Sequence, residues 1–122
     1  MNALVVDDEE DICDFLKEEL ETMGFRVSTA ISGEQAMSLI QSGEWDLLIA
    51  DLKLSTAVTG LEVIKAMRQK CPRAVVAAMS GYVDVGLRQE TEKLGIQCYL
   101  EKPGDVQPDV FCGKIQSLMG KK

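Results

Sequence analysis

Asp46-Leu47-Leu48-Ile49-Ala50-Asp51 is an apolar run that begins just after Trp45 and ends on one acidic residue. Consecutive apolar residues without polar alternation are typical of a strand that is buried on both faces, as in a parallel sheet. A carboxylate at the end of such a strand must be neutralised or used, because an unpaired buried charge is costly. We therefore expect Asp51 to belong to a functional site.

Three other apolar runs along the chain end in a polar residue in the same way. Met1 to Val6 leads into Asp7 and Asp8, Ala74 to Met79 leads into Ser80, and Ile96 to Leu100 leads into Glu101-Lys102-Pro103. Each of these runs is read as a strand, and Phe25 to Ala30 alternates like a further strand. Four strand ends thus carry groups that can bind phosphate or a metal.

Segments with helical periodicity separate the strands. The sequence predicts helices ending at Gly24, Gly43 and Cys71, a fourth from about residue 84 to 94, and a last one that begins at Pro108. Capping boxes are expected where Ser32 precedes Gln35 and where Thr59 precedes Glu62. Five alternations of strand and helix predict an α/β fold with a parallel sheet covered on both faces.

The composition of the chain limits the classes of protein to which it can belong. The chain has 122 residues, enough for one domain, and a net charge of -7, which argues against a nucleic-acid surface. No apolar stretch approaches the ~20 residues that span a bilayer, and no signal peptide is evident. We expect a cytoplasmic protein without membrane contact. The four cysteines form no C-x-x-C pair and are expected to be buried and reduced.

The chain contains no histidine, which excludes Ser-His-Asp and Cys-His hydrolases. Since the carboxyl ends of parallel strands meet at one edge, the topology gathers five polar side chains in one cleft: Asp7, Asp8, Asp51, Ser80 and Lys102. Three carboxylates there repel one another, and a divalent cation such as Mg²⁺ offsets the repulsion. Asp51 can then attack phosphorus as a nucleophile, while Lys102 and Ser80 stabilise the phosphoryl oxygens.

These motifs resemble the receiver domain of bacterial two-component response regulators. The resemblance rests on Val5-Val6-Asp7-Asp8, on Asp46 to Asp51, on Ser80-Gly81 and on Tyr99 to Pro103, and it covers nearly the whole chain. It implies a single receiver domain over residues 1–122. It also implies a doubly wound, five-stranded parallel sheet in the order 2-1-3-4-5, the flavodoxin-like (βα)5 fold of the chemotaxis regulators.

The resemblance also implies a role for each site residue. Asp51 would be the phosphoacceptor, and Asp7, Asp8, Asp51 and the backbone carbonyl of Lys53 would hold Mg²⁺ or Mn²⁺. Ser80 and Lys102 would bind the phosphoryl group. Tyr99 matches the aromatic residue that, in the family, turns inward as the residue at the Ser80 position moves toward the phosphate. The Lys102–Pro103 bond would be cis.

The family also implies partners. A histidine kinase or phosphotransfer protein, or a small acyl phosphate, would supply the phosphoryl group, and the domain would catalyse only its own phosphorylation and dephosphorylation. The output would pass through the face formed by the fourth helix, fifth strand and fifth helix, to an output domain, a downstream protein or a second copy in a phosphorylation-dependent homodimer. The charge added at Asp51 would shift the conformational population.

Three alternatives remain beside this interpretation. The first is a phosphorylation-independent module on the same fold, although such modules usually lack the acceptor or an acidic partner. The second is a Mg²⁺-dependent phosphotransferase, which would favour an acidic residue where Lys53 stands. The third, a flavodoxin-like cofactor binder, lacks a phosphate-binding loop after the first strand. Singly, Ser80 would be a turn residue and Tyr99 a packing residue; their combination favours the receiver.

The loop after Asp51 departs from the family pattern. Receivers commonly carry a Met-Pro pair there, whereas residues 52–59 contain no proline, and the loop is one residue longer than usual.

Tyr82, two residues beyond Ser80, occupies a position at which the family tunes the lifetime of the phosphoryl group. We predict that its bulky ring shields an aspartyl phosphate from water, so that a Tyr82→Ala variant dephosphorylates faster than the wild type. Following loss of the phosphoryl adduct over time by mass spectrometry checks this. An unchanged lifetime would show that Tyr82 has no shielding role.

Overall fold

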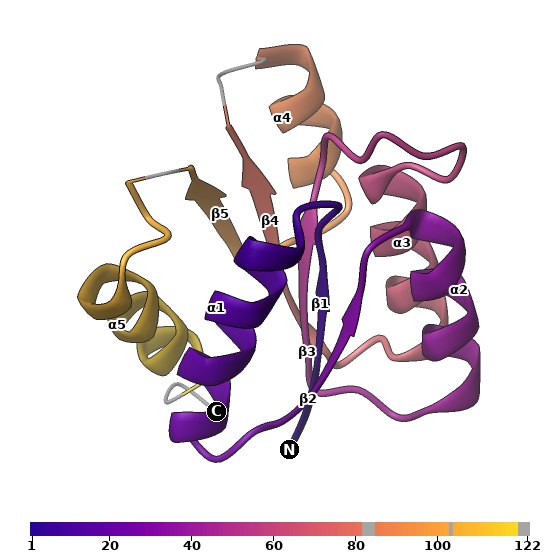
Figure 1. Cartoon of the computed structure of the whole chain (residues 1–122). Helices are drawn as coiled ribbons and strands as arrows, with labels where there is room; N and C mark the ends of the chain where they lie inside the picture. Colours follow the sequence, from indigo (N-terminus) through magenta and orange to yellow (C-terminus); the bar gives the residue numbers. More distant parts are fainter. Residues whose placement is uncertain (82–84, 103, 120–122) are drawn as a thin grey trace.

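The computed structural model describes residues 1–81, 85–102 and 104–119. Strands and helices alternate along the chain, as Figure 1 shows. The elements are β1 (Asn2–Val6), α1 (Glu10–Thr22), β2 (Arg26–Ala30), α2 (Gly33–Ser42), β3 (Leu47–Asp51), α3 (Gly60–Lys70), β4 (Val75–Ser80), α4 (Val85–Glu92), β5 (Cys98–Glu101) and α5 (Pro108–Met119).

The five strands form one parallel sheet in the order β2-β1-β3-β4-β5. The predicted fold class and strand order are therefore confirmed. Strand β3 is central and buried over its whole length, which explains why its sequence is continuously apolar up to Asp51. In register, Val6 lies beside Ala50 and Asp51 beside Met79, so the ends of β1, β3 and β4 are level with one another.

Two apolar clusters fill the space on either side of the sheet. Helices α1 and α5 cover one face, and α2, α3 and α4 cover the other (Figure 1). On the α1 side, Phe111 of α5 and Leu16 of α1 are fully buried. On the other side, Ile40 of α2 and Ile64 and Met67 of α3 are fully buried. This two-sided burial makes the sheet a rigid platform whose carboxyl edge carries the polar residues.

The helix boundaries follow the local sequence signals closely. Thr59 and Glu62 form the predicted capping box at the start of α3. Gly24 and Gly95, which follow α1 and α4, have φ of 94° and 76°, a backbone conformation that favours glycine. At α2, Ser32 accepts from the Gln35 N–H as predicted, but the Gln35 side chain accepts from Ile31 rather than from Ser32.

Two boundaries near the C-terminal half differ from the sequence prediction. Strand β5 begins at Cys98 rather than Ile96, because Gln97 uses its side chain as well as its backbone to bond the start of β4: its N–H donates to Val76 O and its Oε1 accepts from Val76 N–H. Helix α4 ends at Glu92 rather than Leu94, where a turn closes on Gly95.

The burial predicted for the four cysteines is found for two of them. All four cysteines are free, with Cys13 and Cys71 buried and Cys98 and Cys112 half-buried. Burial raises the pKa of the Cys13 thiol to about 11, so it stays protonated and behaves as a small apolar side chain. Among the helices in the described ranges, none combines the length and the apolar character needed to cross a membrane.

Arg68, near the end of α3, holds together the edge of the sheet opposite the polar strand ends. Its guanidinium donates to the Gln97 side chain at 2.9 Å and to four backbone carbonyls, those of Pro72, Ala74, Leu94 and Gly95. One side chain thus joins α3 to the start of β4 and to the α4–β5 connection. The planar guanidinium is suited to this role because its N–H groups point outward as a fixed fork.

We predict that Arg68→Ala lowers the free energy of unfolding by about 2–3 kcal/mol, because it leaves several carbonyls without their charged donor. Arg68→Lys should recover only part of this loss, since an ammonium cannot reproduce the fork. Urea unfolding followed by circular dichroism measures both. Arg73→Ala, at an exposed arginine nearby, serves as the control and should change stability little. Equal stability of the Arg68 and Arg73 variants would contradict the prediction.

Candidate functional site

The carboxyl edge of the sheet brings three carboxylates together. Asp7 follows β1, Asp8 follows Asp7, and Asp51 ends β3. Each offers one carboxylate oxygen, and these oxygens all lie within 4.8 Å of one another. Asp7 and Asp51 are buried and Asp8 is half-buried, so the cluster is open to solvent mainly on the Asp8 side.

Lys102, directly after β5, supplies the positive charge for this cluster. Its Nζ lies 2.6 Å from Asp7 Oδ2 and 3.0 Å from Asp51 Oδ2, and its side chain is only 14% exposed. Its backbone N–H donates to the Ser80 carbonyl at 2.8 Å, which fixes the residue beside the end of β4. One ammonium therefore joins the ends of β1, β3 and β5.

For both Asp7 and Lys102, burial and ion pairing shift the pKa in opposite directions. Burial raises the pKa of Asp7 above its ordinary value of 3.8, although hydrogen bonds from Lys102 and from the Glu9 N–H oppose the change. Burial also disfavours the charge on Lys102. Its hydrogen bond to Asp7 and the attraction of Asp51 outweigh this, so that the pKa of Lys102 is raised. The site therefore keeps a charged lysine beside the Asp7 carboxylate, whose charge burial disfavours.

Asp8 and Asp51 take further hydrogen bonds from the loop between β3 and α3. Asp51 Oδ1 accepts from the Lys53 N–H at 2.9 Å, which places Lys53 next to the acceptor candidate. Asp8 Oδ2 accepts from the Ser55 hydroxyl at 2.7 Å and from the Ser55 N–H at 3.2 Å. These bonds, with the hydroxyl as the main contributor, lower the pKa of Asp8. Ser55 is a member of the site that sequence reasoning missed.

Ser80 and Tyr99 occupy different parts of the edge. Ser80 ends β4, is buried, and pairs in register with Glu101, the residue before Lys102. Tyr99, two residues earlier in β5, packs against the cluster on the α2–α3–α4 side. Its hydroxyl is buried and has no hydrogen-bond partner among residues 1–81, 85–102 and 104–119. Tyr82 and Pro103, for which we predicted shielding and a cis bond, lie outside the described residues.

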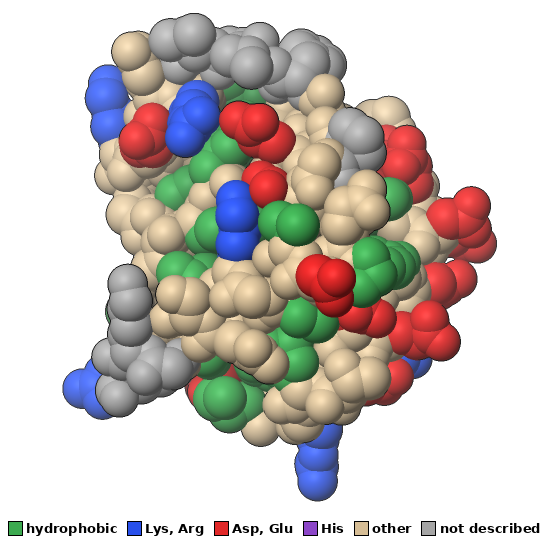
Figure 2. All heavy atoms as spheres, turned by 90° about the vertical axis from the view of Figure 1, so that its left-hand side faces the viewer, with side chains coloured by type: hydrophobic (Ala, Val, Ile, Leu, Met, Phe, Trp, Pro, Cys, Tyr) green, Lys and Arg blue, Asp and Glu red, His purple; other side chains and the backbone are tan. Residues whose placement is uncertain are grey.

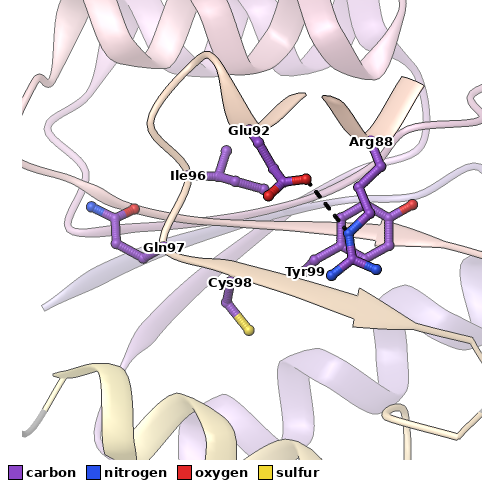
Figure 3. Close-up of a pocket in the computed structure, with 6 residues that line it drawn as sticks. All are labelled: Arg88, Glu92, Ile96, Gln97, Cys98 and Tyr99. Carbon is purple, nitrogen blue, oxygen red and sulfur yellow. Dashed lines mark ion pairs between the residues drawn. The ribbon is translucent and has the colours of Figure 1, made fainter. Parts of the chain in front are cut away.

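A pocket of about 200 Å³ lies between α4 and β5, beside Tyr99. Figure 3 shows Arg88 of α4 reaching over the Tyr99 ring while Cys98 points to the other side of the strand. The Arg88 guanidinium carbon lies 4.5 Å from the ring centroid, and the group also pairs with Glu92 at 3.8 Å and Glu101 at 3.9 Å. This cation–π contact covers the ring of Tyr99, for which the resemblance to receiver domains predicts a switch role.

The surface near the site is acidic. Figure 2 shows acidic side chains gathered along one margin of the face that carries α5. Helix α1, which packs beside α5, exposes Glu10, Asp14 and Glu18. The net charge of -7 is thus concentrated in part around the helix that begins next to Asp7 and Asp8.

We predict that Lys102→Met lowers the free energy of unfolding by about 3 kcal/mol at pH 7, because it leaves two buried carboxylates without a counter-charge. The cost should shrink as the pH falls toward 4. Burial raises the pKa of Asp7 in the folded state, so protonated Asp7 stabilises the fold below pH 3.8, and this stabilisation is lost as the pH rises through the folded pKa. Loss of the lysine charge raises this pKa further, so the variant recovers stability as Asp7 becomes protonated. Urea unfolding at both pH values measures the difference.

Lys114→Met is the matched control for Lys102→Met. Lys114 also pairs with an aspartate, Asp105, at 3.0 Å, but its side chain is 42% exposed. An exposed pair contributes only about 0.5 kcal/mol. If the two variants lose similar stability, the buried ion pairs of Lys102 contribute no more to stability than the exposed pair of Lys114.

Comparison with known proteins agrees with this geometry. The family model for the response regulator receiver domain matches residues 3–110. The transcriptional regulatory protein ZraR of Klebsiella oxytoca is 32% identical over 86% of this chain, which spans 24% of that protein. The sporulation initiation phosphotransferase F of Bacillus subtilis is 29% identical over 84% of this chain and 82% of its own length.

Solved structures show the same architecture. A CheY-like receiver domain protein from Methanospirillum hungatei superposes with a TM-score of 0.90 at 25% identity, covering 98% of this chain and 94% of that one. TrrA from Thermotoga maritima, in complex with Mg²⁺-BeF, gives 0.78 at 32% identity, covering 96% and 97%. A regulator from Burkholderia pseudomallei with a phosphorylated aspartic acid and a calcium ion gives 0.80 at 25% identity, covering 97% and 72%.

The family match extends over most of the chain, and the strand order, the acidic cluster and the lysine after β5 all accompany it. The chain therefore belongs to the response regulator receiver domain family, whose members are phosphoacceptor signalling domains.

Proposed function

We propose that residues 1–122 form one receiver domain that accepts a phosphoryl group on Asp51 in a two-component signalling pathway. The observation that supports this most directly is the Lys102 ammonium, which lies between the buried carboxylates of Asp7 and Asp51. A buried carboxylate at a strand end, with a cation and two further carboxylates beside it, is suited to carry charge that changes during a reaction.

The donor set fits a divalent cation. The three carboxylates offer oxygens close enough to share one ion, and Mg²⁺ binds through carboxylates while keeping waters and accepting phosphate oxygens. We assign Asp7, Asp8, Asp51 and the backbone carbonyl of Lys53 as the protein ligands, for Mg²⁺ or Mn²⁺. When bound, such a cation would neutralise the carboxylates and draw charge from the phosphoryl oxygens.

In the proposed reaction, a carboxylate oxygen of Asp51 forms a bond to phosphorus as the bond between phosphorus and the donor breaks. The leaving group, a kinase imidazole or a small carboxylate, takes the electron pair. Lys102, which pairs with Asp51 before transfer, would pair with the phosphoryl oxygens afterwards. The Ser80 hydroxyl, at the neighbouring strand end, would donate a hydrogen bond to them. Such catalysis depends on positioning and charge stabilisation.

We further propose that Ser80 and Tyr99 transmit the change to the face formed by α4, β5 and α5. The Tyr99 ring lies against Arg88 of α4, so a change at the ring would reach this helix directly (Figure 3). A histidine kinase or phosphotransfer protein would supply the phosphoryl group. An output domain, a downstream protein or a second phosphorylated copy would bind the α4-β5-α5 face.

The decisive experiment is intact-mass analysis after incubation with acetyl phosphate, with and without Mg²⁺. We expect one phosphoryl adduct on the wild type, dependent on Mg²⁺, and none on Asp51→Asn, because the amide is a poor nucleophile toward phosphorus. Asp46→Asn is the matched control. Asp46 lies at the other end of β3, where it accepts a hydrogen bond from the Asn2 N–H that an asparagine can also accept.

An adduct on both the wild type and Asp46→Asn, and none on Asp51→Asn, would support the assignment. An adduct that persists in Asp51→Asn would move the acceptor to another residue. Absence of any adduct on the folded wild type would favour the phosphorylation-independent module.

A further inference from the structure

The loop between β3 and α3 is held by side-chain hydroxyls and lacks the Met-Pro pair that the resemblance to receiver domains predicts at this place. Residues 52–59 contain no proline, and the loop instead carries two adjacent hydroxyl residues, Ser55 and Thr56. Proline restricts a loop through its ring, whereas a hydroxyl restricts a loop only through its partners. The partners of Ser55 and Thr56 therefore decide what the loop does.

Ser55 holds the Asp8 carboxylate. Its hydroxyl and its backbone N–H both donate to the same oxygen, Asp8 Oδ2, at 2.7 and 3.2 Å. Lys102, in contrast, bonds to Asp7 and Asp51. Asp8 is also the most accessible of the three carboxylates, so its orientation depends on the contact with Ser55 more than on packing. A carboxylate can accept about four hydrogen bonds or metal bonds, which leaves Asp8 able to bind a cation while Ser55 stays in place.

Thr56 and Val58 fix the position of the loop from the other side. Thr56 Oγ1 accepts from the Gly33 N–H at 3.2 Å and donates to the Val58 carbonyl at 2.7 Å. Gly33, the first residue of α2, is so close to the loop that a Cβ there would lie 2.2 Å from the Val58 oxygen. The loop is therefore docked on the N-terminus of α2, and these contacts hold Ser55 in place beside Asp8.

We propose that Ser55 is a positioning residue that orients Asp8 for divalent cation binding and so sets the cation affinity of the site. This rests on the proposed cation site formed by Asp7, Asp8 and Asp51. Groups that hydrogen-bond metal ligands orient them, and removing such a group typically weakens metal binding about 10–100-fold. Because Asp8 is partly exposed, we expect an effect near the lower end, about tenfold.

Mn²⁺ binding tests this without any phosphorylation assay, since electron paramagnetic resonance measures free Mn²⁺ directly during a titration. We expect Ser55→Ala to raise the Mn²⁺ dissociation constant about tenfold. Ser55→Thr, which keeps the hydroxyl, should leave the constant close to the wild-type value. In an Asp8→Asn background, Ser55→Ala should have no further effect, because Ser55 acts through Asp8. Ser42→Ala, which removes a hydroxyl bonded to the Leu39 carbonyl at the far end of α2, is the matched control.

Tighter or unchanged Mn²⁺ binding in Ser55→Ala would overturn the proposal, and tighter binding would show that Ser55 competes with the cation. The same weakening in Ser42→Ala, or in Ser55→Ala on the Asp8→Asn background, would also overturn it. A wild type that does not bind Mn²⁺ would refute the cation site and this inference together. A wild type that binds, an Asp8→Asn variant that binds weakly and an unaffected Ser55→Ala would refute this inference alone.

Discussion

The structure depends on one ammonium group placed between two buried carboxylates. Asp7 and Asp51 end neighbouring strands at the centre of the sheet, where water is largely excluded, and neither charge would be tolerable there without Lys102. Because Lys102 is also held through its backbone to the end of β4, the ends of β1, β3, β4 and β5 are linked through it. A group that adds negative charge at Asp51 must therefore redistribute the bonds of Lys102. Under the proposed function, the contact that stabilises the two buried carboxylates would also make the domain respond to phosphorylation of Asp51.

Most of the fold could be predicted from the sequence because its signals are local. The run Leu47 to Ala50 is apolar since both faces of β3 are covered, and its last residue, Asp51, lies at the sheet edge where all parallel strands end. Thr59 and Glu62 cap α3 through bonds between residues three apart, which a reader can recognise from spacing alone. Topology then places Asp7, Asp8, Asp51 and Lys102 together without any knowledge of side-chain contacts.

The contacts that could not be predicted are those between residues far apart in the sequence with no motif to join them. Ser55 and Asp8 are 47 positions apart, and nothing distinguishes Ser55 from the other serines except its place in an unusual loop. The apolar neighbours of Gln97 predict a strand at this residue, whereas its side chain bonds Arg68 and the backbone of β4. Arg88 gave no sequence signal for its place over Tyr99. Each depends on how helices pack against the sheet, which periodicity does not specify.

The start of α3 bears on how this family varies in sequence. Gly60 lies so close to the backbone of Asp51 that a Cβ there would be 2.2 Å from the backbone carbonyl oxygen of Asp51. The chain thus leaves Asp51, passes through residues 52–59, and returns at Gly60 to contact the backbone of Asp51. A loop whose two ends are in contact can lengthen by a residue without displacing either end, at a small cost in closure entropy. An added residue in this loop therefore costs the fold little closure entropy, and the residues that contact the acidic cluster can differ while Asp51 and α3 stay in place.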